Sequence, residues 1–170
     1  MNRSLEHISK PFNELSVQSL TEDEASGILS WRYPAPFDYY DPPGAGGEEL
    51  ISQFLDPVNG FFGIRDAQRG FVGFCSFGRD GQVLGGKYDG HALDIGLGMK
   101  PDLISQGNGT AFFQAIVLFA TQTLAANSLR LTVADFNTRA IRIYERVGFV
   151  VMEQFHEPVY GVSHSIMVRR

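Results

Sequence analysis

The chain has 170 residues, of which 44% are hydrophobic and 19% charged, a composition typical of one globular domain that we expect to span residues 1–170. Its net charge of −5 and the lack of a basic run argue against nucleic acid as the main partner. The single cysteine excludes an internal disulfide, and no Cys/His spacing is typical of a metal site. Residues 1–10 carry no apolar signal core and the apolar run 111–120 is too short to span a bilayer, so we expect a cytoplasmic protein without a membrane partner.

The first predicted elements are a strand over residues 14–20 and a helix over residues 22–30. Thr21 precedes that helix and Glu24 follows three residues later, which is the pattern of a capping box. Residues 31–47, WRYPAPFDYYDPPGAGG, contain four prolines that disfavour regular structure, yet they carry five aromatic side chains. Such a loop should pack on something, because exposed aromatic surface is costly.

Strands and helices alternate through the rest of the chain, with a polar, glycine-rich loop over residues 80–90. In chain order, the further predicted elements are a short helix over 47–55, strands over 59–66 and 69–78 that form an antiparallel hairpin, a strand over 92–100, a largely buried helix over 103–126, a strand over 128–135, a helix over 137–147, and two closing strands over 150–160 and 162–170. The β-α-α-β-β-β-α-β-α-β-β order predicts an α/β protein, an α+β mixed sheet with helices on both faces.

A glycine turn, QGNGTA, stands where the long central helix begins. The first backbone N–H groups of a helix have no intrahelical partner, and the positive end of the helix dipole lies there as well. A helix that starts after such a turn suits an anion, because glycines let the backbone approach closely. The alternative is that Asn108 simply caps a core helix.

Two glycines, Gly96 and Gly98, flank Leu97 inside a predicted strand. Glycine weakens a strand interior and often marks a bulge or a close approach of another backbone. One interpretation is close packing against a helix. The other is that the strand separates from its neighbour at this point and leaves its backbone groups open to a ligand.

Three motifs resemble those of the Gcn5-related N-acetyltransferase (GNAT) superfamily. The family's pyrophosphate-binding pattern, Gln/Arg-x-x-Gly-x-Gly/Ala, is matched by Gln106, Gly109 and Ala111. The family's acidic-apolar-Gly-x-x-apolar-x-Pro strand is matched by Asp94, Ile95, Gly96, Met99 and Pro101. The family's Asn-x-x-Ala, aromatic, Gly-Phe helix is matched by Asn137, Ala140, Tyr144, Gly148 and Phe149. The order of these motifs and of the predicted elements fits the family over nearly the whole chain.

The resemblance implies a GNAT-like fold with a splayed central strand pair and acetyl-coenzyme A (acetyl-CoA) as the bound cofactor. The cofactor-binding residues it implies are Leu97, Gly98, Met99, Gln106, Gly107, Asn108, Gly109, Thr110, Ala111, Asn137, Ala140 and Tyr144. The thioester carbonyl is expected near the amide of Leu97, which would stabilise its developing negative charge. Many relatives have a cation inside the glycine turn, whereas here the nearest is Lys100, so we expect cofactor binding to depend only modestly on salt.

Acyl transfer to an amine needs a base and an acid. The resemblance implies that Tyr144 is the acid, and a tyrosine with a reference pKa of about 10 is protonated at neutral pH. The alternative for Tyr144 is core packing with Ile141 and Val147. Asp94 matches an acidic residue that serves some relatives as base through water, although it could equally be a solvated residue on the polar face of its strand.

The acceptor site is expected in the aromatic loop, where the family's first two helices shape the acceptor pocket. The candidate wall residues are Trp31, Tyr33, Phe37 and Tyr40. They could hold an apolar or a cationic acceptor, the latter by cation–π contact. Nearby carboxylates would favour a protonated amine; they are Asp38, Asp41, Glu48 and Glu49. The alternative is that the aromatics only attach the loop to the sheet. Residues 157–164 are expected to form the opposite wall.

The favoured function is an acetyl-CoA-dependent N-acetyltransferase that acts by direct attack of a primary amine of a small molecule or peptide. A non-catalytic acyl-CoA-binding sensor on the same fold is the alternative. A nucleotide-binding module is disfavoured, because the chain lacks the Gly-x-x-x-x-Gly-Lys-Ser/Thr pattern. The resemblance allows a monomer or a homodimer.

Overall fold

The computed structural model describes residues 11–44 and 46–170, so the expectation about residues 1–10 lies outside it. The elements in chain order are β1 (Leu15–Ser19), α1 (Glu22–Leu29), α2 (Gly47–Leu55), β2 (Phe61–Asp66), β3 (Gly70–Phe77), β4 (Leu93–Met99), α3 (Gly109–Gln122), β5 (Leu129–Ala134), α4 (Thr138–Arg146), β6 (Val150–His156) and β7 (Ser163–Arg169). Short 3-10 turns are η1 (Phe37–Tyr40), η2 (Pro57–Asn59), η3 (Arg79–Gly81) and η4 (Pro101–Leu103). The predicted order of strands and longer helices is confirmed.

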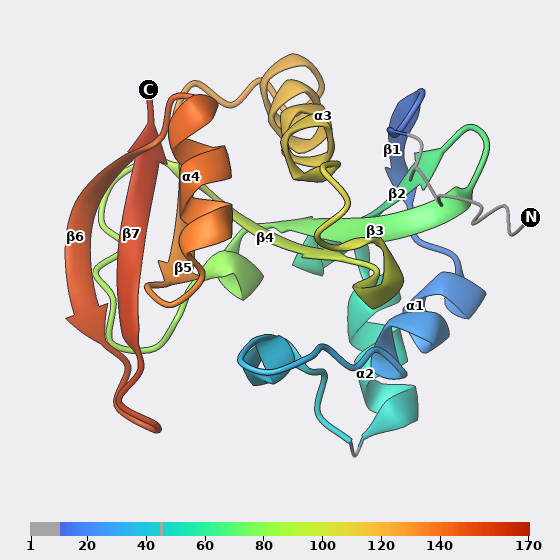
Figure 1. Cartoon of the computed structure of the whole chain (residues 1–170), viewed down its shortest axis with the longest axis horizontal. Helices are drawn as coiled ribbons and strands as arrows, with labels where there is room; N and C mark the ends of the chain where they lie inside the picture. Colours follow the sequence, from blue (N-terminus) through green and yellow to red (C-terminus); the bar gives the residue numbers. More distant parts are fainter. Residues whose placement is uncertain (1–10, 45) are drawn as a thin grey trace, which may run out of the picture.

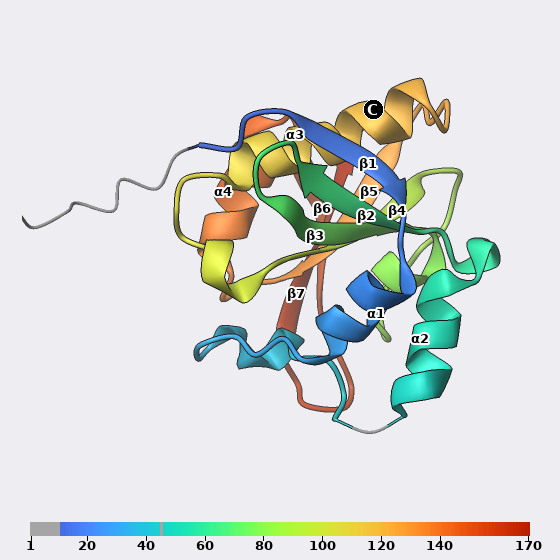
Figure 2. The same ribbon diagram turned by 90° about the vertical axis from the view of Figure 1, so that its right-hand side faces the viewer.

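The seven strands form one mixed sheet in the order β1-β2-β3-β4-β5-β7-β6. All neighbours are antiparallel except β4 and β5, which run parallel. Helices α3 and α4 cover one face of the sheet, and α1 and α2 lie on the other (Figures 1 and 2). No helix in the described part of the chain combines the length and the apolar character that crossing a membrane requires.

Local sequence signals account for the boundaries of α1 and α3. The predicted capping box at α1 is present, since the Thr21 hydroxyl accepts the N–H of Glu24 (3.3 Å) and the Glu24 carboxylate accepts the N–H of Thr21 (3.0 Å). The predicted helix over 103–126 is too long at both ends. Gly107 has φ +81° before α3 and Ala125 has φ +53° after it, and a left-handed residue ends helical geometry.

Two apolar clusters stabilise the two faces of the sheet. The larger packs α3 against the sheet, with Phe112, Phe113 and Ile116 fully buried. The smaller lies beneath α1, where Trp31 packs against the rings of Phe71 and Phe74 with centroids 6.0 and 5.9 Å apart. Burial of large apolar side chains on both faces holds the sheet between two helical layers.

Strands β4 and β5 pair over only part of their length. Their register runs from Leu93 opposite Leu129 to Ile95 opposite Leu131 and ends there. In Figure 1, β5 lies with β7, β6 and α4 on one side of the molecule, whereas β4 continues alongside β3. The predicted splayed strand pair is therefore confirmed, and the opening begins at Gly96.

Candidate functional site

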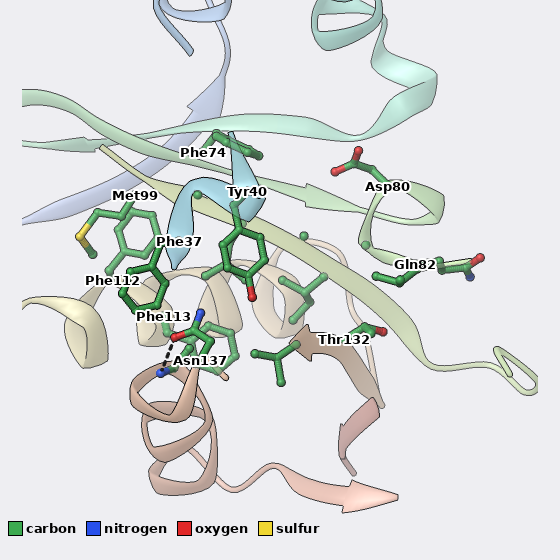
Figure 3. A pocket seen from close by; sticks show the side chains of 18 of the residues that line it. Phe37, Tyr40, Phe74, Asp80, Gln82, Met99, Phe112, Phe113, Thr132 and Asn137 are labelled. Carbon is green, nitrogen blue, oxygen red and sulfur yellow. Dashed lines mark hydrogen bonds between the residues drawn. The ribbon is translucent and has the colours of Figure 1, made fainter. Parts of the chain in front are cut away.

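A cavity of about 1490 Å³, here called the main cavity, extends from the opening between β4 and β5 to the aromatic loop (Figure 3). Its volume is somewhat larger than that of most small-molecule sites. The segments that line it are the aromatic loop, α2, the β3–β4 connection, the second half of β4, the start of α3 and one side of α4. One half of the main cavity therefore adjoins the glycine turn, and the other adjoins the aromatic loop.

The second half of β4 directs backbone groups into the opening. The N–H of Gly78, the residue after β3, donates to the carbonyl of Asp94 (2.9 Å). The backbone groups of Asp94 therefore point toward the β3 side of the strand. Backbone groups alternate between the two sides of a strand. Leu97 and Met99 therefore point their N–H and C=O groups away from β3, toward the side from which β5 has diverged. The hydroxyl of Tyr33 donates to the carbonyl of Met99 (2.8 Å), which occupies that carbonyl and leaves the N–H groups of Leu97 and Met99 facing the opening.

Asn108 occupies the N-cap position of α3, as its alternative role requires, but its side chain makes no capping hydrogen bond. The Asn108 Oδ1 atom accepts the backbone N–H of Phe12 instead (2.9 Å), and its buried Nδ2 atom has no hydrogen-bond partner among the described residues. The helical hydrogen bonds of α3 begin with the N–H of Phe112, which donates to the carbonyl of Asn108 (3.0 Å). The amides of residues 109–111 are thus positioned as donors for an anion.

The glycine turn contributes to the main cavity only in part. Gly107, Gly109 and Thr110 line it, whereas the predicted binding residues Gln106, Asn108 and Ala111 are not among the lining residues. The side-chain amide of Gln106 donates to the carbonyl of Asp102, within the turn itself. A Cβ atom at position 109 would collide with the side chain of Ile143, so glycine allows α3 to lie close to α4. The turn therefore offers backbone donors rather than side chains.

Three arginines on α4 face the main cavity, and the sequence analysis did not assign them. They are Arg139, Arg142 and Arg146. Their spacing of three and four residues places them on one side of the helix, and this spacing is the signal that could have found them. Arg139 also lies over the ring of Phe37, with its guanidinium carbon 5.0 Å from the ring centroid. These arginines favour a stronger salt dependence than the neutral turn alone predicts.

Tyr144 is buried between α4 and α3 and lines the main cavity. Its ring lies against Phe113 with centroids 4.6 Å apart, so part of the packing alternative holds. Burial raises the pKa of Tyr144, and Tyr40 raises it further. A phenol with a raised pKa stays protonated at neutral pH, which is the state a proton donor needs.

Asp94 does not reach the main cavity, and neither sequence-based alternative for it matches its surroundings. Its carboxylate accepts two hydrogen bonds from Arg130, at 2.5 and 2.8 Å, and one from Gln82 at 2.8 Å. The Asp94 side chain is 5% exposed and that of Arg130 is 6% exposed, so the pair is buried rather than solvated. The ion pair raises the pKa of the Arg130 guanidinium. The alternation of the strand placed Asp94 on a polar side, but the sequence did not show that Arg130 would fill that side.

All four predicted wall residues of the aromatic loop line the main cavity; they are Trp31, Tyr33, Phe37 and Tyr40. Figure 3 shows the Tyr40 hydroxyl directed toward Asn137, which caps α4. The alternative role in attaching the loop also holds, because Trp31 is buried in the smaller core. Of the predicted acidic neighbours, only Asp41 is a lining residue.

The prediction that residues 157–164 form the opposite wall of the acceptor site is wrong. No residue of 157–164 is among the lining residues. Residues 78–86 form this wall instead and bring Asp80 to the main cavity, although the sequence predicts the end of a strand at Gly78 and a polar loop from residue 80. Glu157 accepts the backbone N–H groups of Val159, Tyr160 and Val162 and so uses its carboxylate to close its own turn.

Comparison with known proteins adds a sequence match and a fold match. The family described as acetyltransferase (GNAT) domain matches residues 15–150. No curated protein matches the chain. An acetyltransferase of the GNAT family from Bacillus anthracis has a similar structure, with a TM-score of 0.69 at 17% identity, over 92% of this chain and 95% of the other. A chimera of the spermidine N-acetyltransferase SpeG from Vibrio cholerae gives 0.67 at 21% identity, over 92% and 95%. SpeG from Vibrio cholerae in complex with manganese ions gives 0.66 at 17% identity, over 92% of each chain.

Proposed function

The chain belongs to the GNAT family of acetyltransferases, and from this premise we propose that it transfers the acetyl group of acetyl-CoA to a primary amine of a small molecule or peptide. The observation that carries the proposal is the opening between β4 and β5 beside the uncapped start of α3. A ligand with an extended, amide-bearing arm can pair with the open edge of a strand, as a peptide does in strand addition. Its phosphate groups can bind the helix start.

The residues around the opening fit the donor chemically. The amides of residues 109–111 and the guanidinium groups of Arg139, Arg142 and Arg146 would hold phosphate groups. The N–H groups of Leu97 and Met99 would pair with the arm. The buried Nδ2 atom of Asn108 lies in the same turn and has no acceptor among the described residues. The turn thus contains a hydrogen-bond donor that a bound polar ligand could satisfy.

Two groups of this chain would act on the reaction itself. Bound acetyl-CoA supplies a thioester, whose C–S bond breaks as the amine forms a C–N bond. The Leu97 amide would donate to the carbonyl oxygen as negative charge develops on it. The Tyr144 hydroxyl would give its proton to the leaving sulfur, and the proton that the new amide nitrogen must lose would restore it.

The choice of acceptor rests on the other half of the main cavity. Its lining combines the aromatic loop with half-buried Phe54, Phe61 and Phe74. Two of the similar structures are of a spermidine N-acetyltransferase, which makes a polyamine one acceptor to compare. A small amine with an apolar part suits the walls of this chain.

Two measurements on the purified chain test the proposal. We expect titration calorimetry to give saturable binding of acetyl-CoA and no binding of ATP at the same concentration. We also expect release of free thiol only when a primary amine is added, with an acetylated amine detected by mass spectrometry. Binding without turnover across a broad amine panel would favour the sensor, and a lack of acetyl-CoA binding would contradict the proposal.

A further inference from the structure

One carboxylate in the wall of the main cavity, that of Asp80, has a single hydrogen-bond partner among the described residues. Asp80 lies in the 3-10 turn η3, and its side chain is exposed to the main cavity. Its Oδ2 atom accepts the hydroxyl of the fully buried Ser76 (2.7 Å). Among the described residues no cation forms an ion pair with it, and Oδ1 has no hydrogen-bond donor. A carboxylate oriented by one neighbour and otherwise open is suited to bind a ligand cation.

The first glycine of β4 brings Asp80 against the strand. A Cβ atom at Gly96 would lie 2.9 Å from Asp80 Oδ2 and closer still to the Ser76 hydroxyl. The next turn residue, Gly81, is packed equally closely, since a Cβ there would lie 2.7 Å from the carbonyl carbon of Ile95. The Asp80 carboxylate therefore lies against Gly96, the first residue of β4 beyond the pairing with β5. Leu97, whose amide faces the opening, is the next residue in the strand.

The second glycine of β4 brings an aromatic wall to the same face. Residues 96 and 98 share one face of the strand, because side chains alternate. A Cβ atom at Gly98 would lie 2.5 Å from the ring of Phe74. This ring therefore covers β4 two residues after Gly96, the position that lies against Asp80. Phe74 in turn contacts the rings of Trp31 and Phe61, with centroids 5.9 and 6.0 Å apart. One negative group and a broad apolar wall thus lie next to each other.

We propose that Asp80 binds the ammonium group of the acceptor while the apolar body of the acceptor, an aryl or alkyl group, lies against Phe74 and its aromatic neighbours. This inference rests on the proposed function, and it narrows the acceptor to a small amine that combines an ammonium group with an apolar body. The carboxylates among the described lining residues are Asp41 and Asp80, and Asp41 already accepts the backbone N–H of Tyr33 (2.8 Å). Asp41 thus keeps one oxygen without a donor among the described residues, as Asp80 does, so a triamine such as spermidine would still leave one ammonium group without a carboxylate in this wall.

Asp80 also receives the proton that the acceptor must lose. The ammonium transfers one proton to the carboxylate, which passes it to water, and the nitrogen lone pair becomes free to form the C–N bond. Two functions therefore meet in one group, since the contact that orients the nitrogen near Leu97 is the contact that deprotonates it.

The first test measures acceptor binding by the donor-free protein with 2-phenylethylamine, followed by NMR titration. We expect 2-phenylethanol, which has the same body without the charge, to bind at least about tenfold more weakly to the unaltered chain. We expect Asp80→Asn to weaken 2-phenylethylamine binding by a similar factor, and spermidine to bind no more tightly than 2-phenylethylamine. Equal binding of the amine and the alcohol, or tighter binding of spermidine, would overturn the inference without any variant having to fold.

The second test uses turnover with two acceptors of similar size. 2-Phenylethylamine is protonated at neutral pH, whereas 4-ethylaniline is not. We expect Asp80→Asn to lower kcat/KM for 2-phenylethylamine by about 100-fold and that for 4-ethylaniline by less than about fivefold. Asp89→Asn is the matched control, because Asp89 lies in the same β3–β4 connection but not among the residues that line the main cavity.

The outcomes separate this inference from the proposed function. Unchanged acetyl-CoA affinity in Asp80→Asn shows that the variant keeps its fold. Normal acetylation of 2-phenylethylamine by Asp80→Asn would overturn the role of Asp80 and leave the acetyltransferase standing. A third outcome is that the unaltered chain binds 2-phenylethylamine but releases no thiol with any amine, and that Asp80→Asn loses this binding. That outcome would overturn the proposed function and leave the ammonium site standing.

Discussion

The two halves of β4 differ in what their backbone and side chains do. From Leu93 to Ile95 the strand pairs with β5, and the Asp94 carboxylate is enclosed with Arg130. From Gly96 to Met99 the strand has no partner on that side, and its neighbours stand close against it because two positions lack a Cβ. The first half is closed by pairing and by a buried ion pair, whereas the second half leaves its backbone donors facing the opening.

This difference shows why residue type alone misassigns function along the strand. The Asp94 carboxylate lies in the paired section of β4, where it is enclosed and bonded to Arg130. Glycines weaken a strand, and here they mark the section where pairing with β5 has ended. Asp80 reaches the main cavity from outside the strand, across one of those glycines. Position relative to the end of pairing therefore separates the enclosed Asp94 from Asp80, which lines the main cavity.

The largest expected effect comes from breaking the closed half of β4. Arg130→Met leaves Asp94 as a buried charge without its partner, and such a loss costs about 3–5 kcal/mol in the free energy of unfolding. Urea unfolding measures it. The double variant Asp94→Leu/Arg130→Met should regain most of the stability, because it removes both charges. A loss below about 1 kcal/mol in Arg130→Met would show that the pair does not secure this half.

The next effect belongs to Tyr144, the proposed acid beside the open half. Tyr144→Phe removes one hydroxyl and keeps the ring against Phe113, so we expect an unchanged unfolding midpoint. Turnover should fall by about 100-fold, since a positioned proton donor contributes at least that much. Steady-state kinetics with saturating amine measures it. A turnover equal to that of the unaltered chain would remove Tyr144 from the mechanism.

A smaller effect comes from adding a Cβ to the open half. Gly98→Ala places a methyl group 2.5 Å from the Phe74 ring, which must move, and overpacking of this kind costs about 1–3 kcal/mol. Gly27→Ala in α1 is the matched control, because nothing lies within 4 Å of a Cβ there. The control should keep or raise the thermal midpoint, since alanine favours a helix. Equal behaviour of the two variants would mean that Gly98 is not closely packed.

The smallest effect concerns the arginines that border the open half. Arg142→Gln should weaken acetyl-CoA binding by about fivefold at low salt and by less at high salt, because screening reduces the contribution of an exposed charge. Calorimetric titrations at two salt concentrations measure it. Lys87→Gln, an exposed cation that does not line the main cavity, should leave the affinity unchanged. The same affinity loss at both salt concentrations would contradict an electrostatic role.

Much of the fold could be predicted from local signals. The capping box at Thr21, the hairpin over β2 and β3 and the end of α4 at Gly148 all depend on residues close in sequence. The predicted helix over 103–126 failed at both ends, because left-handed residues such as Gly107 interrupt a stretch whose apolar pattern continues.

The site was predictable where a motif matched it and unpredictable where distant segments met. The aromatic loop and Tyr144 line the main cavity as expected. Asp94 was misassigned because its partner Arg130 is 36 residues away in sequence. Asp80 was missed because its contact with Gly96 exists only once η3 has packed on β4. The cytoplasmic location, the single-domain extent and the monomer or dimer state stay predictions.

The most direct test of the open half is hydrogen exchange at single amides of β4, followed by NMR with and without acetyl-CoA. In the free chain, we expect the amide of Ile95 to be protected and that of Leu97 to exchange quickly, because pairing with β5 ends between them. Acetyl-CoA should slow exchange at Leu97 and leave Ile95 unchanged. Equal protection of both amides in the free chain, or no change at Leu97 on binding, would contradict a donor site in the opening.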